Sequence, residues 1–239
     1  ILDAIEEAEA QVQDITQSPR GSIYVAAPLG VGRRFIAPAV PDFKEKYPLI
    51  DVRLRLSDRS VDLTAEGLDV AFFLGTPKDS TFKMKKIADC PRLLCAAPSY
   101  LKQRGAPQSL KELTDGTHDC LNLRFPGASE FQWPLMTENG VQRCAVKGPF
   151  ESDDGDVLTN WAVDGFGIIM KPYFEVADHL QSGALVAVLP QHGPVEIQLG
   201  CLYPHRRKQD PKVRLFIDFM AERSAAQMAT IMLGVQLPR

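Results

Sequence analysis

Residues 22–56, SIYVAAPLGVGRRFIAPAVPDFKEKYPLIDVRLRL, decide the fold of this chain. The run Ile23–Ala27 is apolar and rich in strand formers, and Pro28 closes it, so it predicts a β-strand. Gly30 and Gly32 then supply permissive backbone where the strand must turn into a helix. The helix is predicted by one apolar stripe, formed by Ile36, Val40, Phe43 and Tyr47.

Pro48 stops the predicted helix, and residues 50–56 alternate apolar and polar side chains as a second strand does. A strand, a helix and a second strand in this order form a parallel βαβ unit with a right-handed crossover. The turn after the first strand lies at the carboxyl edge of the sheet, where the helix offers free backbone N–H groups. Ligands of open α/β sheets bind at this edge, so residues 28–31 are candidate ligand-binding residues.

The composition is that of an ordinary globular protein that does not itself grip nucleic acid. Hydrophobic residues make up 45% and charged residues 24% of the 239 residues, which argues against disorder. The formal net charge of −3 and the pI near 5.9 argue against a basic nucleic-acid-binding face. No apolar run approaches the ~20 residues that span a bilayer. The start Ile1-Leu2-Asp3 has no initiator Met and no signal-peptide pattern, so we expect a fragment of a longer cytoplasmic protein without a membrane partner.

The cysteines are scattered and include no C-x-x-C pair. An odd, dispersed set favours reduced thiols in an intracellular protein over a disulfide framework. Buried, inert thiols are the preferred interpretation, and a redox pair of Cys90 with Cys95 is the alternative. The five cysteines are Cys90, Cys95, Cys120, Cys144 and Cys201.

A helical segment precedes the βαβ unit. Its apolar residues alternate between spacings of four and three, which is the seam of a coiled coil. The segment is therefore expected to be the end of a coiled coil leading to another domain, and packing on its own domain is the alternative. The seam consists of Ile1, Ile5, Ala8, Val12 and Ile15.

Downstream of residue 56 the chain alternates between predicted strands and helices. A short helix over 61–66, capped by Ser60 or Asp58, precedes a strand over 68–74, and Asn139-Gly140 predicts a hairpin between 131–138 and 142–150. No element is assigned to residues 228–237. The other predicted strands are 92–97, 120–124, 168–170, 184–189 and 195–203, and the other predicted helices begin at 98 or cover 110–113, 154–164, 172–180 and 211–220.

Four ordered motifs resemble the effector-binding domain of LysR-type transcriptional regulators. They are GSIYVAAP at 21–28, the string from Asp58 to Ala71, APSYL at 97–101 and the closing helix 211–220. The resemblance implies an α/β fold of two Rossmann-like subdomains joined by two crossover strands, as in type 2 periplasmic binding proteins. It implies a linker helix ending at residues 1–19, a regulatory subdomain I over 20–92 and 203–239, and a subdomain II over 93–202.

The resemblance also implies a small-molecule site in the cleft between the two subdomains. Similar regulators often carry an arginine at position 124, as here, but also an arginine at 73 and an asparagine at 153, where this chain has Phe73 and Asp153. A core role for Phe73 and a plain surface role for Arg124 are the alternatives. We expect a largely apolar effector with one carboxylate. The negative charge of Asp153 would favour an amine-bearing ligand, so an amino acid is the alternative effector. The candidate ligand-binding residues are Pro28, Leu29, Gly30, Val31, Ser57, Phe73, Leu74, Arg124, Phe125, Asp153 and Phe166.

No residue pattern supports catalysis, a metal site or a cofactor. His118, Asp119 and Cys120 are adjacent residues at the start of the strand predicted over 120–124, and adjacent side chains of extended backbone point to opposite faces, which disfavours hydrogen bonds among them. The acids of 152–156 miss the spacing of a calcium loop and fit a capped helix N-terminus. The Gly30-x-Gly32 pattern has Phe35 where a dinucleotide fingerprint needs its third glycine.

We therefore expect the effector-sensing and oligomerisation domain of a LysR-type regulator, not an enzyme, acting without a cofactor as a homodimer or homotetramer. DNA would be contacted only through the missing N-terminal domain, and RNA polymerase is a further possible partner. Effector binding would favour one arrangement of the oligomer and so change DNA binding. The alternatives are a periplasmic-type solute-binding protein for a small organic acid or amino acid, against which the coiled-coil seam argues, and a cytosolic enzyme.

Overall fold

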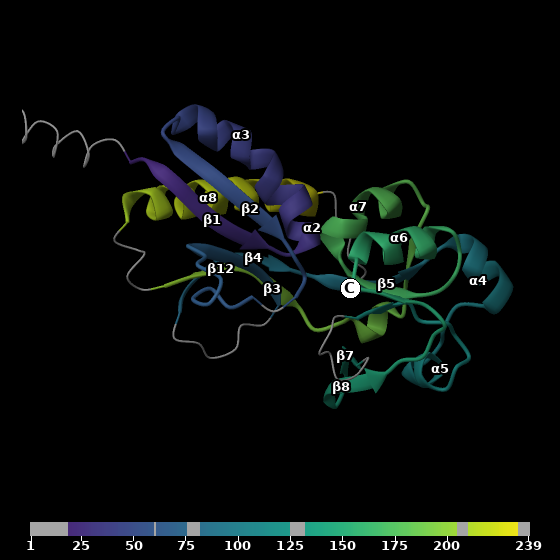
Figure 1. Cartoon of the computed structure of the whole chain (residues 1–239). Helices are drawn as coiled ribbons and strands as arrows, with labels where there is room; N and C mark the ends of the chain where they lie inside the picture. Colours follow the sequence, from purple (N-terminus) through teal and green to yellow (C-terminus); the bar gives the residue numbers. More distant parts are fainter. Residues whose placement is uncertain (1–18, 60, 76–81, 125–131, 205–209, 234–239) are drawn as a thin grey trace, which may run out of the picture. The chain divides into compact units, whose positions relative to one another are not determined.

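The computed structural model describes residues 19–59, 61–75, 82–124, 132–204 and 210–233 (Figure 1). The chain divides into two compact units. Unit 1 comprises the described residues of Ile1–Phe73, Lys78–Ile87 and Gly200–Ala225. Unit 2 comprises the described residues of Leu74–Pro77, Ala88–Leu199 and Ala226–Arg239. The expected coiled-coil seam at the N-terminus lies outside the described residues.

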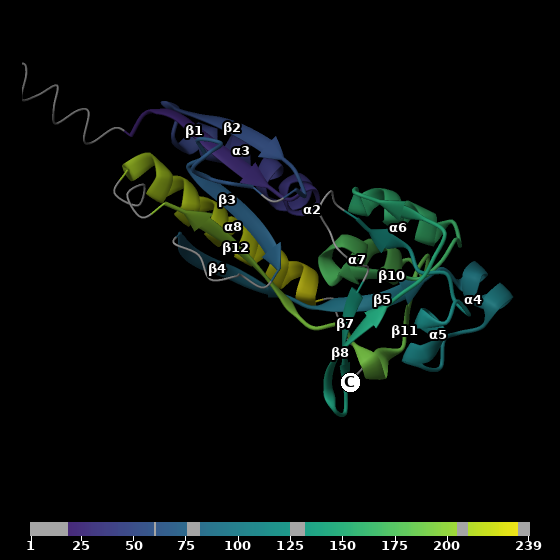
Figure 2. The ribbon, with the colours of Figure 1, turned by 60° about the horizontal axis from the view of Figure 1, so that its bottom comes forward.

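One sheet organises unit 1, with its strands in the order β2-β1-β3-β12-β4 (Figure 2). β1 lies between β2 and β3 and is parallel to both, which confirms the parallel βαβ unit. Boundaries between the units fall inside β3, β4, β12 and the C-terminal helix α8 (Pro211–Leu233), so the chain passes from one unit to the other within these elements. The strands are β1 (Gly21–Ala27), β2 (Ile50–Leu56), β3 (Val70–Gly75), β4 (Lys83–Cys90) and β12 (Ile197–Tyr203).

The segment between β1 and β2 is one continuous helical run, made of α2 (Leu29–Val31), the π-helical η1 (Gly32–Ile36) and α3 (Ala37–Lys46). The expected glycine turn before the helix is wrong, because the run begins directly after Pro28. Gly32 has a helical φ of −61°, so its role is not to make a turn. A Cβ at this position would lie 2.1 Å from Cδ2 of Leu56, so any larger residue would displace the Leu56 side chain of β2.

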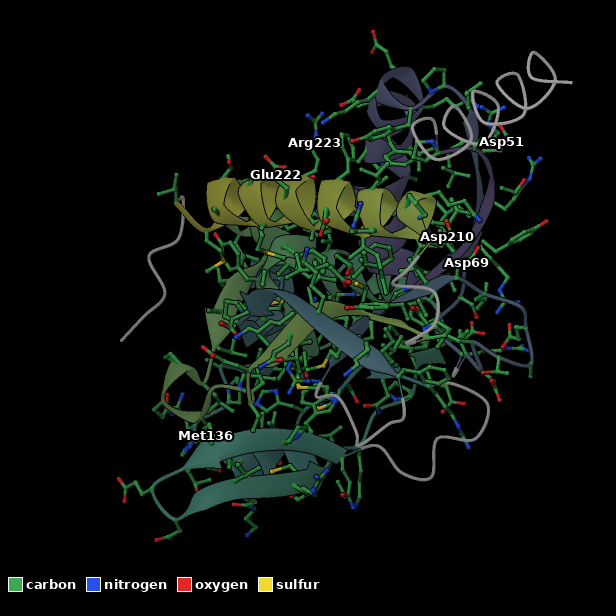
Figure 3. All side chains as sticks on the ribbon, turned by 90° about the vertical axis from the view of Figure 1, so that its left-hand side faces the viewer. Asp51, Asp69, Met136, Asp210, Glu222 and Arg223 are labelled. Atoms are coloured by element: carbon green, nitrogen blue, oxygen red, sulfur yellow. The ribbon has the colours of Figure 1, made fainter. Side chains whose placement is uncertain are left out.

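The helix α8 (Pro211–Leu233) packs against α3 in the core of unit 1. The rings of Phe43 and Phe216 meet edge to face, with 5.0 Å between their centroids. Arg223 of α8 forms an ion pair with Asp42 of α3, and Figure 3 shows the position of Arg223 on α8. α8 continues beyond the helix predicted over 211–220, through part of the segment that the sequence left unassigned.

Unit 1 differs from the sequence-based prediction in one further helix and one strand. The expected helix over 61–66 is wrong, because residues 63–67 form turns, which the hydrogen bond of 2.9 Å from Leu68 N–H to Leu63 O closes. Strand β4 was not predicted, since its sequence KMKKIADC shows no apolar alternation. β4 is one of the two edge strands of the sheet, and unlike in β2 the partly buried residues of β4 do not alternate regularly with exposed ones.

Unit 2 contains three small sheets: β10-β5-β11, the parallel pair β6-β9 and the hairpin β7-β8. Its strands are β5 (Arg92–Ala96), β6 (Asn122–Leu123), β7 (Gln132–Thr137), β8 (Gly140–Ala145), β9 (Glu151–Ser152), β10 (Ile169–Pro172) and β11 (Val186–Val188). Its helices are α4 (Pro98–Arg104), α5 (Leu110–Thr114), α6 (Gly155–Val163), α7 (Tyr173–Gln181) and the short η2 (Pro190–His192).

Two apolar clusters hold unit 2 together. One gathers Trp133 and Leu135 of β7 with Leu113 of α5, and the other gathers Leu158 of α6 with Val176 of α7. The predicted hairpin is confirmed, but Thr137 pairs with Gly140, so its loop consists of residues 138–139. The cross-strand pair Met136 and Val141 is exposed, and Figure 3 labels Met136 on this hairpin.

Candidate functional site

The first candidate segment, residues 28–31, lies where β1 passes into the helical run. Leu29 and Gly30 are half-buried, whereas Val31 is fully buried in the core. The backbone N–H of Leu29 is not available to a ligand, since it donates to Oδ1 of Asp58 at 2.8 Å. The carboxylate of Asp58 therefore caps the start of this helix. The sequence predicts that the carboxylate of an effector binds at the same place.

Ser57 and Asp58 follow β2 directly and lie beside the end of β1. The N–H of Ser57 donates to the carbonyl of Ala27 at 2.9 Å, which continues the pairing of β1 with β2 past the last paired residue of each strand. The hydroxyl of Ser57 accepts from the N–H of Arg59 at 3.2 Å. The structure thus brings Leu29 and Ser57 together at the carboxyl edge of the sheet, as the βαβ pattern predicts.

Phe73 and Leu74 lie on β3, and both are half-buried. The ring of Phe73 covers the backbone of Gly200 on the neighbouring strand β12, because a Cβ on Gly200 would come within 2.6 Å of the ring. This is the contact that a packing residue makes across a sheet. Gly200 has no side chain, and the ring of Phe73 fills the space that one would occupy.

In unit 2, Arg124 follows β6 and pairs with Glu151 of β9. Nη1 of Arg124 lies 3.0 Å and 3.1 Å from the two carboxylate oxygens of Glu151. The side chains are 51% and 49% exposed, so this is a solvated ion pair. Exposed pairs of this kind contribute ~0–1 kcal/mol to stability. Arg124, the cation predicted to bind the effector, is therefore paired with a protein carboxylate, and replacing that carboxylate by another would cost little free energy.

Asp153 is exposed and lies immediately before the helix α6. Asp154 caps α6, because its Oδ1 accepts from the N–H of Asp156 at 2.8 Å. This capped N-terminus confirms that the acidic run 152–156 begins a helix. Asp153 is left as a solvent-facing carboxylate at the corner between β9 and α6.

A buried cation, Lys171, binds the first turn of α6. Nζ of Lys171 donates to the carbonyl of Gly155 at 3.0 Å and forms an ion pair with Glu175 of α7. The two charged side chains are only 5% and 9% exposed. A Cβ on Gly155 would lie 2.6 Å from this Nζ, which explains the glycine at the helix start. The corner that carries Asp153 is therefore fixed by a buried ion pair.

Phe166 belongs to an exposed aromatic cluster on unit 2. Phe166 is 49% exposed, and its ring centroid lies 5.6 Å from that of Phe150, which in turn lies 5.4 Å from that of Trp161. Aromatic rings at the surface offer apolar area to a ligand at low entropic cost. Phe125, a further candidate, lies outside the described residues.

Sequence reasoning missed the partners of these candidate residues. Asp58 was considered only as a cap for the wrongly predicted helix, although it occupies the same position after β2 as Ser57. Glu151 and Phe150 had no local signal, because their contacts depend on the parallel pairing of β6 with β9. Knowledge of that register would have placed Glu151 opposite Asn122 and within reach of Arg124.

The potentially reactive side chains are in environments that do not support catalysis. Nδ1 of buried His118 lies 3.2 Å from Oη of Tyr100, while Asp119 pairs with Arg104, so the expected absence of a His118-Asp119 contact holds for these residues. Within the described residues, no group of three or more His, Cys, Asp or Glu side chains is placed to hold a metal ion. None of the described helices is long and apolar enough to cross a membrane.

All five cysteines are buried and free. Burial is the main cause that raises the pKa of Cys90 to about 11 and the pKa values of Cys95, Cys120 and Cys201 to about 12. Burial also raises the pKa of Cys144. Thiols with such pKa values stay protonated at neutral pH and are poor nucleophiles, in agreement with the interpretation as inert thiols.

Comparison with known proteins identifies the family. The model of the LysR substrate binding domain matches residues 16–225 of the chain. The chain belongs to this family. It is the effector-binding regulatory domain of a LysR-type transcriptional regulator, and it is not an enzyme.

Relatives of known sequence and structure agree with this assignment. The chain is 30% identical to the HTH-type transcriptional regulator DmlR of Escherichia coli over 223 residues, which are 93% of this chain and 71% of DmlR. Full-length AphB of Vibrio cholerae is 28% identical and superposes with a TM-score of 0.77, covering 93% of this chain and 75% of AphB. The regulatory domain of CrgA from Neisseria meningitidis is 26% identical with a TM-score of 0.74, covering 86% of this chain and all of that domain.

Proposed function

We propose that this domain senses a small organic acid or an amino-acid-like molecule through the candidate ligand-binding residues described above. Binding would favour one arrangement of the regulator and change how its DNA-binding domain engages an operator in the cytoplasm. The observation that carries the proposal is the family match over residues 16–225, because the matched family is defined by its effector-binding domain.

Arg124 is the proposed partner of the effector's carboxylate. Its guanidinium already binds a carboxylate, that of Glu151, with the Nη1 contacts of an exposed ion pair. A ligand carboxylate can replace Glu151 with little loss, because exposed ion pairs contribute only ~0–1 kcal/mol. Asp153 is the proposed partner of an ammonium group, since its carboxylate is exposed and no described residue pairs with it. An amino acid would satisfy both side chains.

The apolar part of the effector is proposed to contact the exposed aromatic cluster and the half-buried aliphatic residues among the candidates. Phe166 and Phe150 present 49% and 37% of their surface to solvent. Covering such rings stabilises a complex by roughly 25 cal/mol per Å² of apolar surface. Leu29 and Leu74 offer further apolar surface from their own units.

A thermal-unfolding screen of small aromatic acids, aliphatic acids and amino acids tests the proposal. A ligand that binds only the folded state stabilises it by ~2.7 kcal/mol at 100 times its Kd, which is a shift of several degrees. Arg124→Gln should abolish the shift for a carboxylate. Arg104→Gln is the matched control, because Arg104 forms a similarly exposed pair with Asp119. Equal shifts in wild type and Arg124→Gln would contradict the role of Arg124.

We further propose that the regulator is a homodimer or homotetramer, with α3 in the contact surface and RNA polymerase as a further partner. α3 exposes Pro38, Pro41 and Glu45 while it buries Phe43. Light scattering of the purified chain over a concentration series tests the assembly. A mass that stays that of one chain up to the highest concentration would contradict it.

A further inference from the structure

Arg92 of unit 2 is a cation that is not among the candidate ligand-binding residues. It is the first residue of β5, and its side chain is largely buried. Nε and Nη2 donate to the carbonyl of Val195 at 2.8 Å and 2.5 Å. Both hydrogen bonds go to one neutral acceptor, so one edge of the guanidinium is used and the other is not.

No carboxylate neutralises Arg92 within the part of the chain that the structure describes. Its only hydrogen bonds there are those to Val195, and it takes part in no ion pair. Burial lowers the pKa of Arg92 to about 10, and no neighbouring charge contributes to that shift. Burying a charge without a partner costs stability, and an anion that pairs with the guanidinium would offset this cost.

Other arginines of the described chain differ from Arg92 in this respect. Arg104 pairs with Asp119 at 2.7 Å, and Arg124 pairs with Glu151 at 3.0 Å. Both of these paired arginines are about half exposed, whereas Arg92 is more buried and pairs with no acid. Arg92 therefore differs from both of these arginines in its burial and in its lack of an acidic partner among the described residues.

The N-terminus of α7 lies beside Arg92. Pro172 of β10 is its partner in the antiparallel register, and α7 begins at the next residue, Tyr173. The N-terminus of a helix carries a partial positive charge. The nearby acid of α7, Glu175, is already paired with Lys171 in the buried ion pair beneath α6. The acids closest in sequence to Arg92 and to Val195 are Asp89 and Glu196, and neither contributes to the pKa shift of Arg92.

We propose that Arg92 binds an oxyanion, either an inorganic phosphate or the carboxylate of a small molecule, through the guanidinium edge that Val195 leaves unused. Arginine suits this role because its planar fork can donate two parallel hydrogen bonds to two oxygens. The bond to Val195 holds the guanidinium in place, so little side-chain entropy is lost when the anion binds. The site does not depend on the effector-binding role of Arg124.

The test measures thermal unfolding of the 239-residue chain in sodium phosphate and in sodium chloride at equal ionic strength. Wild type should be stabilised saturably by phosphate and not by chloride. Arg92→Gln should weaken the apparent phosphate affinity at least ~10-fold, equivalent to ~1.4 kcal/mol. Arg104→Gln should retain the wild-type response. Equal phosphate responses of wild type and Arg92→Gln, or no response of wild type beyond chloride, would overturn the site.

A second measurement keeps the proposal testable if Arg92→Gln does not fold. The Nε–H signal of Arg92 in wild type, followed by NMR, should shift saturably as phosphate is added, and the Arg104 signal should not. An Arg92 signal that stays unchanged would show that Arg92 only clamps Val195, which would overturn the proposal. Added succinate separates the two sources of the anion. Displacement of phosphate assigns the site to carboxylates as well, and no displacement assigns it to phosphate alone.

Discussion

The carboxylate of Asp58 and the backbone N–H of Leu29 are joined by a hydrogen bond of 2.8 Å that connects the end of β2 with the start of the helical run after β1. At the carboxyl edge of the sheet in unit 1, the N–H group of Leu29 is therefore already bound by a carboxylate of the protein itself. A carboxylate at a helix N-terminus is stabilised both by the N–H and by the helix dipole. An anionic effector would therefore have to compete with Asp58 at this position.

The cap should be measurable as stability. Asp58→Ala should lower the free energy of unfolding by about 1 kcal/mol, because a helix cap is lost. Asp58→Asn should retain most of it, since the amide oxygen can still accept from Leu29 N–H. Urea denaturation followed by circular dichroism measures both. An unchanged midpoint for Asp58→Ala would mean that the contact contributes nothing.

The buried pair of Lys171 and Glu175 should be far more sensitive than an exposed pair. Lys171→Met leaves a carboxylate that is 9% exposed without its cation, and removing one partner of a buried pair costs about 3–5 kcal/mol. Lys85→Met removes the cation of the exposed pair with Asp218, and should cost ~0–1 kcal/mol. Denaturant titration of the two variants compares them directly. Similar losses in both would contradict the burial argument.

The thiols predict a loss of stability in alkaline solution. An unfolded thiol has a pKa of ~8.5, whereas Cys90 in the folded chain has a pKa of about 11 and Cys201 of about 12. Between these values the folded state binds more protons than the unfolded state, so stability falls as the pH rises. Each such thiol contributes up to ~1.4 kcal/mol per pH unit.

The measurement is the free energy of unfolding from pH 8 to pH 11 under reducing conditions. Cys201→Ala should make the decline shallower, whatever its effect on the stability at pH 8. A slope identical to that of wild type would show that Cys201 does not stay protonated in the folded state at these pH values.

Much of the fold was readable from local patterns, and the exceptions have physical causes. β1 was predicted because its burial requires an apolar run, and β2 because its half-buried apolar residues alternate with exposed polar ones. β4 was missed because its sequence KMKKIADC shows no such alternation. The helix predicted over 61–66 is replaced by turns at 63–67, because Asp62 Oδ1 accepts from the N–H groups of Thr64 and Ala65 and such local hydrogen bonds favour turns over a helix.

The candidate site was less accessible to sequence reasoning than the fold. The pattern placed Leu29 and Ser57 at one sheet edge correctly, because strand order alone determines that. The carboxylates of Asp58 and Glu151 that meet Leu29 and Arg124 come from other strands, and only the three-dimensional register brings them there. Arg92 gave no signal at all, because its isolation is a property of its surroundings.

The most direct test of the central claim is isothermal titration calorimetry of the chain with the carboxylate that gives the largest thermal shift. The account predicts saturable binding to wild type and to Arg104→Gln, and binding at least ~10-fold weaker to Arg124→Gln, which corresponds to ~1.4 kcal/mol. Binding of equal affinity to wild type and to Arg124→Gln would contradict the account.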